Sequence, residues 1–349
     1  MRHWQYAAFG GPDQLALVES PRPEPGPGEV LIRVTRCGVN PIDVSTMSGR
    51  FKGLGLPHTP GAEVAGVVEA LGAGVSEPRA GARVAVAFRL FCNRCYYCLR
   101  GREIDCAGFA QAPGPAIFGV ITNGGMGEYV VVPALNALLV PDGVSDDQAC
   151  AAALDGATAY HLVDRAGVRD GEGVLVVGAT GGVGSFAVQF AAQRGATVWG
   201  LGRGPAAEAR LRAWGAAAAL DRDAEDVAAR VQELSGGRGV DVALDPVGAG
   251  TWPLSMGALA QGGRYATCGI LTGAEVQLNL GPFYTRQQQV IGSTGGSRGD
   301  LATVLAALQA GRIEAPIWRT YPLEEAPAAF AALKEPGRIG KVLLVVSSP

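Results

Sequence analysis

The sequence has few of the features that mark a membrane, secreted or nucleic-acid-binding protein. No apolar run reaches the ~18 residues that a membrane span needs, and the first residues, MRHWQYAAFGGPDQ, lack the apolar core of a signal peptide. The formal net charge is −3 and only Lys52, Lys334 and Lys341 are lysines, so no basic surface is expected. We therefore predict a cytoplasmic protein without nucleic-acid or membrane partners.

The composition is that of a globular protein with a substantial core. Apolar residues make up 48% and charged residues 17% of the 349 residues, a length that suggests two domains. The 52 glycines are about twice the usual share of ~7%. Many tight turns and close backbone approaches are therefore expected.

Two kinds of pattern divide the chain. Runs rich in β-branched residues and cut by Gly and Pro predict strands at 29–39, 63–72, 82–88 and 127–133. From about residue 145, which opens a predicted helix over 145–167, strands alternate with helices, as in a doubly wound parallel sheet. We predict an α/β fold with a β-rich domain over 1–133, to which 298–349 return, and a parallel-sheet domain over 134–297.

Four of the seven cysteines lie within fifteen positions, spaced Cys92-x2-Cys95-x2-Cys98-x7-Cys106. Thiols stay reduced in the cytoplasm, so clustered cysteines favour metal binding. Zn²⁺ accepts four thiolates in a tetrahedron, and four cysteines make a closed, structural site. Disulfides or unconnected thiols are the alternative, and the spacing matches neither ferredoxin pattern for a 4Fe–4S cluster.

A glycine-rich loop lies between a predicted strand and a predicted helix. Its pattern predicts a turn, a close approach of backbone to a pyrophosphate, and close packing of helix on strand. The candidate dinucleotide-binding residues of the loop are Gly178, Ala179, Thr180, Gly181, Gly182, Val183 and Gly184. The alternative is a plain turn.

The end of the next predicted strand indicates which dinucleotide binds. An NAD site places Asp or Glu there for the ribose 2′-hydroxyl, whereas this chain has Gly202 and Arg203. A guanidinium pairs with a 2′-phosphate, so NADP(H) is favoured over NAD. Arg203 as a solvated loop residue is the alternative.

Nearly the whole chain resembles the medium-chain dehydrogenase/reductase family. The resemblance rests on GVNPID, PGAEVAGVVEALGAGV, the cysteine lobe, GGMGEYVVVP, GATAY, GATGGVGSFAVQFA and GKVLLV. It implies a GroES-like catalytic domain and a Rossmann cofactor domain with the cofactor in the cleft between them. It also implies a homodimer joined through the Rossmann sheets, or a tetramer.

Zinc alcohol dehydrogenases of this family hold a second, catalytic zinc. By resemblance, its ligand positions fall on Asn40, Ala62 and, approximately, Leu154. These residue types bind Zn²⁺ poorly, so we predict that the structural zinc is retained and the catalytic zinc is lost. A displaced metal site built from Asp43, His58, Glu63 and Asp155 is the alternative.

The resemblance also implies roles for individual residues. Asn40 and Thr158 are expected beside the nicotinamide, as catalytic and cofactor-binding residues, and Tyr160 either there or in the core. Lys341 matches a position near the cofactor, or is a solvated strand end. Gly269 and Ile270 fall at a strand end near the cofactor. Cys37, Cys150 and Cys268 are expected to be small core residues. No residue stands out as the proton donor, for which His58, Tyr160 and water are candidates.

Three functions follow from these expectations. The first is an NADPH-dependent oxidoreductase that transfers hydride to a quinone or an α,β-unsaturated carbonyl without a catalytic zinc. The second is an alcohol dehydrogenase with a displaced metal, and the third is a non-catalytic NADPH-binding protein.

Overall fold

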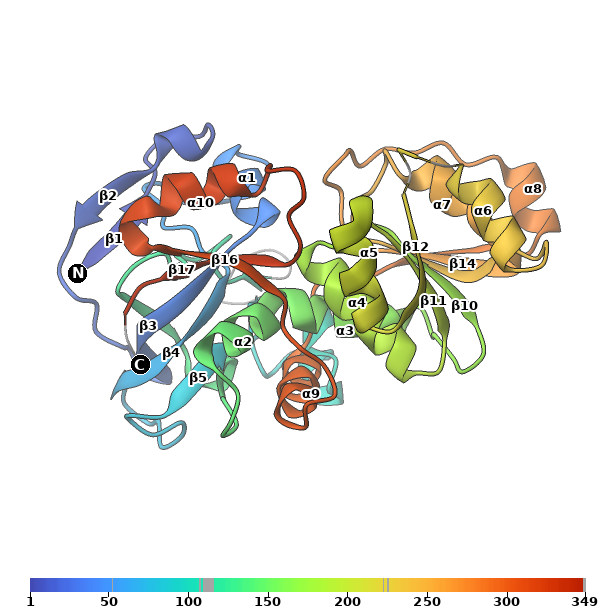
Figure 1. Cartoon of the computed structure of the whole chain (residues 1–349). Helices are drawn as coiled ribbons and strands as arrows, with labels where there is room; N and C mark the ends of the chain where they lie inside the picture. The colour runs from blue at the N-terminus through green and yellow to red at the C-terminus, as the bar shows by residue number, and fades with distance from the viewer. Residues whose placement is uncertain (52, 107, 109–115, 222, 225, 348–349) are drawn as a thin grey trace. The chain divides into compact units, whose positions relative to one another are not determined.

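The chain folds into two compact units in the computed structural model (Figure 1), which describes all residues except 52, 107, 109–115, 222, 225 and 348–349. One unit comprises Met1–Ala157, Gly296–Pro336 and Lys341–Pro349. The other comprises Thr158–Gly295 and Gly337–Gly340. No helix of the described residues is long and apolar enough to span a bilayer.

A seven-stranded sheet forms the framework of the first unit. Its order is β16-β17-β3-β4-β5-β9, with β8 also paired to β3. Its strands are β3 (Glu29–Val39), β4 (Glu63–Leu71), β5 (Arg83–Val86), β8 (Tyr129–Pro133), β9 (Ala137–Leu139), β16 (Ile317–Pro322) and β17 (Lys341–Val345). The four strands predicted before residue 134 are therefore confirmed, and β17 runs antiparallel to β3.

Short elements complete this unit. They are strands β1 (Arg2–Gln5), β2 (Ala16–Glu19), β6 (Arg89–Leu90) and β7 (Ala116–Ile117), and helices α1 (Pro41–Met47), α2 (Asp146–Ala151), α9 (Arg298–Gln309) and α10 (Ala326–Ala332).

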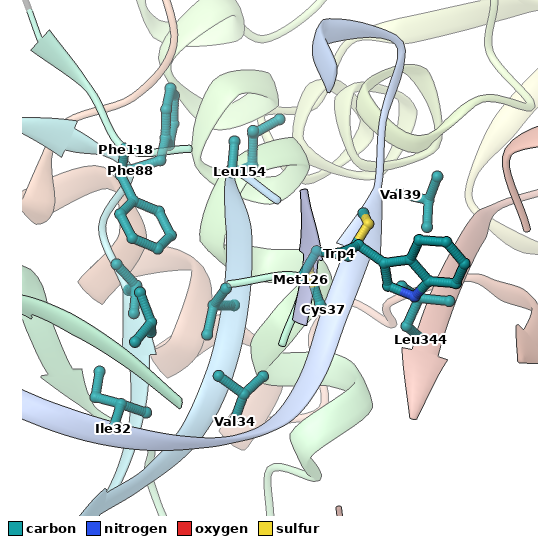
Figure 2. Close-up of a cluster of buried hydrophobic side chains, with 14 of the residues drawn as sticks. Trp4, Ile32, Val34, Cys37, Val39, Phe88, Phe118, Met126, Leu154 and Leu344 are labelled. Carbon is teal, nitrogen blue, oxygen red and sulfur yellow. The ribbon is translucent and has the colours of Figure 1, made fainter. Parts of the chain in front are cut away.

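The core of the first unit lies against this sheet. Figure 2 shows labelled side chains from separate segments, among them Trp4, Phe88 and Met126, gathered in one cluster. Both faces of β3 carry buried side chains: Ile32 and Val34 are fully buried and so is Leu31, which precedes them, although successive side chains of a strand point to opposite faces. Burial of each such side chain contributes roughly 1.5–3 kcal/mol to folding.

The second unit is built on a six-stranded sheet in the order β12-β11-β10-β13-β14-β15. Each neighbouring pair is parallel. The strands are β10 (Gly173–Val176), β11 (Thr197–Leu201), β12 (Ala216–Leu220), β13 (Val240–Asp245), β14 (Leu259–Thr267) and β15 (Gln289–Gly292). Numbered along the chain, this order is 3-2-1-4-5-6, that of a Rossmann dinucleotide-binding sheet, so the predicted fold class is confirmed.

One helix precedes the first strand of this sheet, and others connect its strands. The helices are α3 (Ala157–Arg165), α4 (Gly182–Gln193), α5 (Gly204–Ala213), α6 (Val227–Leu234), α7 (Trp252–Ala258) and α8 (Leu280–Thr285). The strand order reverses between β10 and β13, and ligands of such sheets bind at that point, outside the carboxyl ends of the strands. The glycine-rich loop that follows β10 lies there.

The helix predicted over 145–167 is present, but it is not α-helical throughout. It begins at Ser145, whose hydroxyl accepts from the Gln148 N–H at 3.2 Å while the Gln148 side chain accepts from the Ser145 N–H, as the capping box predicts. A π-helical segment, η5 (Ala152–Gly156), then separates α2 from α3. Hydrophobic periodicity does not reveal such an insertion, and π-bulges often occur at functional sites.

Helix α2 belongs by its contacts to the first unit, whereas the sequence places the division before it, at 133/134. The helix packs on β3, β4 and β5. Its Asp146 pairs with Arg83 and its Asp147 with Arg36, each at 2.5 Å. These long-range ion pairs and packing contacts place the boundary between the units at Ala157.

Candidate functional site

Four cysteines come together in the segment between β6 and β7. The Sγ atoms of Cys92, Cys95, Cys98 and Cys106 all lie within 4.8 Å of one another. Three of the Sγ–Sγ distances are 4.0, 3.6 and 4.0 Å. Two short turns, η2 (Cys98–Arg100) and η3 (Glu103–Asp105), bring the fourth cysteine back to the other three.

These distances fit a single tetrahedral zinc ion. With Zn–S bonds of about 2.3 Å, two ligands of a tetrahedron lie about 3.8 Å apart, and the measured separations are close to this. A disulfide needs about 2.05 Å, and none of the four cysteines is disulfide-bonded. Backbone N–H groups of Arg94 and Cys95 lower the pKa of Cys92. With four protein ligands, a bound zinc would have no open position for substrate.

A second polar cluster is buried in the first unit, around the side chain of Lys341. Its Nζ lies 2.5 Å from Asn40 Oδ1, 2.7 Å from Glu63 Oε2 and 2.7 Å from Asp155 Oδ2. Lys341 is 2% exposed and Glu63 is 0% exposed. An ammonium has three N–H groups, and these three oxygens accept all of them. Lys341 is therefore not the solvated strand end considered in the sequence analysis.

Further hydrogen bonds fix the side chains of Glu63 and Asn40. Glu63 accepts from Asn40 Nδ2 at 2.9 Å and, through its other oxygen, from the Asp155 backbone N–H at 3.1 Å. The Asn40 amide thus turns its oxygen to Lys341 and its nitrogen to Glu63. One Nδ2–H of Asn40 has no role in this network, because the amide nitrogen carries two hydrogens.

The sheet and the π-helical segment position these four residues. Asn40 follows β3, Glu63 begins β4 and Lys341 begins β17, and these three strands are neighbours. Asp155 lies in η5. Gly38 of β3 is opposite Glu63, and a Cβ there would stand 2.8 Å from Glu63 Cδ. The carboxylate of Glu63 therefore occupies space that any other residue at position 38 would fill.

The cluster combines one ammonium with two carboxyl groups. Burial alone lowers the pKa of Lys341, but the Asp155 and Glu63 carboxylates outweigh this and raise the pKa above its ordinary value. Burial raises the pKa of Glu63 to about 7, partly opposed by the Lys341 ammonium and increased by the Asp155 charge. The Lys341 ammonium thus stays charged near neutral pH, whereas the Glu63 carboxylate is able to take up a proton.

Asp43 in α1 is a further buried carboxyl group beside this cluster. It accepts from the backbone N–H groups of Asn40 at 2.9 Å and Gly61 at 3.1 Å. Burial nevertheless raises the pKa of Asp43 from 3.8 to about 6, against the effect of these hydrogen bonds.

We expect stability to fall as the pH rises from about 4 to about 6 because of Asp43. Its folded-state pKa is above its unfolded value, so the folded state holds the proton more tightly, and this stabilisation is lost as the proton leaves. Two pKa units correspond to about 3 kcal/mol. Urea unfolding at several pH values measures the effect, and Asp43→Asn should flatten the dependence; the same slope in both proteins would contradict it.

The positions that resemble catalytic-zinc ligands do not form a metal site. Ala62 is fully buried and Leu154 nearly so, and an alkyl side chain offers no donor atom. Asn40 is engaged with Lys341 and Glu63. Within the described part of the chain, Cys92, Cys95, Cys98 and Cys106 are the one group of three or more His, Cys, Asp or Glu side chains that converge on a common point.

The remaining polar candidates of this unit are buried. His58 is 2% exposed, its Nε2 lies 3.2 Å from the Gly119 carbonyl oxygen, and burial lowers its pKa. Burial also raises the pKa values of Cys37 and Cys150 well above the ordinary thiol value. These two cysteines are therefore unreactive core residues.

The glycine-rich loop after β10 has the geometry of a dinucleotide loop. Gly178 has a positive φ of 62°, which favours glycine. Gly181 caps the N-terminus of α4. A Cβ on Gly184 would overlap Gly178 and stand 2.7 Å from its carbonyl carbon, so α4 packs directly on the loop. The free N–H groups of the first turn of α4 are suited to a pyrophosphate.

Other predicted cofactor residues lie in the same unit. Arg203 at the end of β11 pairs with Asp223 at 2.6 Å, and both side chains are exposed. Gly202 lies beside Thr180, and Gly269 packs tightly on Pro246. Ile270 is 43% exposed.

The two predicted residues of α3 differ in their surroundings. Thr158 is 6% exposed. The Tyr160 ring packs edge-to-face on Phe190, with ring centroids 5.2 Å apart, and the Arg194 guanidinium lies over it. The roles assigned to Thr158 and Tyr160 at the nicotinamide stay predictions.

Known proteins resemble this chain over almost its full length. The profile of the alcohol dehydrogenase GroES-like domain matches residues 26–142, and that of the zinc-binding dehydrogenase matches residues 182–310. An NAD-dependent alcohol dehydrogenase of Sulfurisphaera tokodaii is 31% identical, over 99% of this chain and 100% of the relative. A quinone oxidoreductase of Pseudomonas aeruginosa is 32% identical, over 98% of each. The chain belongs to the medium-chain dehydrogenase/reductase family.

A solved structure of this family is also similar. It is a cobalt- and zinc-bound thermostable alcohol dehydrogenase from Pyrobaculum aerophilum, 43% identical, with a TM-score of 0.90 over 99% of each chain. As a medium-chain dehydrogenase/reductase, the chain is an oxidoreductase. The names of its relatives include both alcohol dehydrogenases and a quinone oxidoreductase.

The structure also shows what sequence reasoning missed. Glu63 and Asp155 were considered only as ligands of a displaced metal, and Lys341 only as a cofactor neighbour or a surface residue. The sequence signal for a buried Lys341 is that a lysine, a rare residue in this chain, stands at the start of an apolar strand. This signal is weak, because the residues that neutralise Lys341 lie 186 or more positions away in the sequence.

Proposed function

We propose that this chain is an NADPH-dependent oxidoreductase that reduces quinones or α,β-unsaturated carbonyls without a catalytic zinc. The observation that carries the proposal is the Lys341 cluster. An ammonium lies among Asn40, Glu63 and Asp155, and alkyl side chains occupy the other positions that resemble zinc ligands. Alcohol oxidation in this family relies on a metal to stabilise the alkoxide, whereas a conjugated carbonyl delocalises the charge that a hydride brings.

The residues of the chain bind and orient the reactants. When bound, NADPH supplies a hydride to the β-carbon of the activated double bond. The loop over 178–184 holds the pyrophosphate at the start of α4. The second Nδ2–H of Asn40 is available to donate to a ligand oxygen, and the Lys341 contact on the amide oxygen keeps that N–H oriented. Thr158 supplies a second donor.

A substrate panel tests the proposal. We expect NADPH oxidation with quinones and small enones, negligible NADP⁺ or NAD⁺ reduction with primary and secondary alcohols, and one zinc per chain by metal analysis. Alcohol oxidation that depends on a second metal ion would overturn the proposal in favour of an alcohol dehydrogenase. NADPH binding without turnover of any member of the panel would overturn it in favour of a non-catalytic binding protein.

Cofactor choice is expected to depend on Arg203. Its guanidinium stands where NAD-binding sheets place a carboxylate. Arg203→Ala should lower kcat/KM for NADPH roughly tenfold, the value of about one charged hydrogen bond, and leave kcat/KM for NADH unchanged.

Asp223→Asn is the matched variant for the Arg203 test. It releases Arg203 from an exposed ion pair, and should raise kcat/KM for NADPH by up to about fivefold. Steady-state kinetics with both nucleotides measures these changes. An equal loss with NADH and NADPH in Arg203→Ala would show that the residue does not contact the 2′-phosphate.

We also propose a homodimer that forms through the parallel sheet. Strand β15 ends that sheet, and Val290 on it is 46% exposed. An exposed edge strand with apolar side chains favours pairing with another chain. Light scattering is expected to give twice the 35.7 kDa of one chain. Val290→Lys should shift the protein toward monomer, and a monomeric wild-type protein would contradict the proposal.

A further inference from the structure

The Lys341 cluster has the geometry of an occupied cation site. Three oxygen atoms from three separate segments, Asn40 Oδ1, Glu63 Oε2 and Asp155 Oδ2, lie 2.5–2.7 Å from a single nitrogen. All four residues are at most 5% exposed. Two carboxyl groups buried this deeply are strongly destabilising unless a positive charge accompanies them.

We infer that the Lys341 ammonium serves as the resident cation of this site. Other cations of similar size can enter the site when the Lys341 side chain is removed. The inference concerns the charge balance of the fold and holds whichever substrate the chain reduces. We name the three oxygens of Asn40, Glu63 and Asp155 the oxygen cage. In the wild-type protein the ammonium fills the cage, so a metal ion cannot bind there.

The dimensions of the cage indicate which cations fit. Oxygen atoms 2.5–2.7 Å from the centre match an ammonium ion, and they come close to Ca²⁺, whose bonds to oxygen are about 2.3–2.6 Å. Zn²⁺ and Mg²⁺ require about 2.0–2.2 Å. Because Asn40 and Glu63 are held by further hydrogen bonds, the cage resists contraction around a small ion. Alkylammonium ions and Ca²⁺ are therefore the best probes.

The test compares Lys341→Ala with Lys341→Met. Lys341→Ala leaves a channel and two uncompensated carboxyl groups, so its Tm should fall by about 10 °C or more. Propylammonium chloride should restore most of this loss, whereas tetramethylammonium chloride at the same ionic strength should not, because it has no N–H. The Met side chain fills the channel without a charge, so Lys341→Met should lose stability and respond to neither salt.

Calorimetric titration with CaCl₂ gives a second readout that is independent of activity. Lys341→Ala should bind one Ca²⁺ per chain beyond any site of the wild-type protein, and Lys341→Met should bind none beyond it. If Lys341→Ala does not fold, the double variant Lys341→Met with Asp155→Asn serves instead, since it removes one carboxylate together with the ammonium. It should be more stable than Lys341→Met alone.

Three outcomes would overturn the inference. The first is a Lys341→Ala protein with the wild-type Tm. The second is equal stabilisation of that variant by propylammonium and tetramethylammonium, which would be a general salt effect. The third is a double variant that is no more stable than Lys341→Met, which would show that the carboxylates do not require a neighbouring cation.

Discussion

Removal of zinc from the four-cysteine lobe is expected to lower the Tm of this protein by about 10 °C or more, because such sites contribute several kcal/mol to folding. Cys92, Cys95, Cys98 and Cys106 have the spacing of a zinc tetrahedron. The segment between them has only two short 3-10 turns. With so little structure of its own, the lobe depends on the metal for its conformation. Cys106→Ser should release the zinc and expose residues 92–106 to proteases.

A control keeps this prediction specific. Cys268 lies outside the lobe and is partly exposed, so Cys268→Ser should retain one zinc per chain and the wild-type protease pattern. Metal analysis, thermal unfolding and limited proteolysis are the three measurements. A Cys106→Ser protein that has lost its zinc but keeps the wild-type Tm and protease resistance would contradict a stabilising role for the metal.

Replacement of Gly184 by alanine is expected to weaken NADPH binding roughly 100-fold, the equivalent of about 2–3 kcal/mol of overpacking. The new Cβ would stand 2.7 Å from the carbonyl carbon of Gly178. The group that it meets is backbone, and the backbone of residue 184 fixes the position of the Cβ, so the strain cannot be relieved by a side-chain rotation. The segment over 178–181 must shift away from α4, and the N–H groups aimed at the pyrophosphate are displaced.

Gly257→Ala is the matched control for this substitution. Gly257 lies in α7 of the same unit, and a Cβ there meets no atom within 4 Å. Alanine should stabilise that helix slightly and leave the Kd for NADPH unchanged. Fluorescence titration of NADPH measures both variants. Wild-type affinity in Gly184→Ala would show that the loop does not hold the pyrophosphate in this way.

Much of the fold was predictable because its signals are local. β3 (Glu29–Val39) consists largely of β-branched and apolar residues, and the pattern predicts it with its bounds. The alternation of strands and helices predicts the parallel sheet. β12 (Ala216–Leu220) was missed, because its sequence AAAAL favours a helix by propensity and becomes a strand only by pairing with β11. The sequence also does not indicate that the helix over 145–167 is π-helical at η5.

The residues of the candidate site likewise include some that local sequence patterns predict and some that they do not. The cysteine lobe and the glycine loop each lie within one short segment, so spacing alone predicts them. The environment of Lys341 depends on Asn40, Glu63 and Asp155, which come from three distant segments. No local pattern relates these residues, and the sequence therefore left Lys341 between two opposite interpretations, a buried residue at the cofactor or a solvated strand end.

The sequence by itself determined the two kinds of domain pattern and the zinc-spaced thiols, and it predicts a dinucleotide-binding loop and, by resemblance, the loss of the catalytic zinc. Tertiary structure alone decided the environment of Lys341. The pairing of β17 with β3 and of β3 with β4, together with the π-helical turn at Asp155, brings one ammonium to two buried carboxyl groups. Charge neutralisation requires that the charged groups lie within a few ångströms of one another, and separation along the chain does not indicate which groups do.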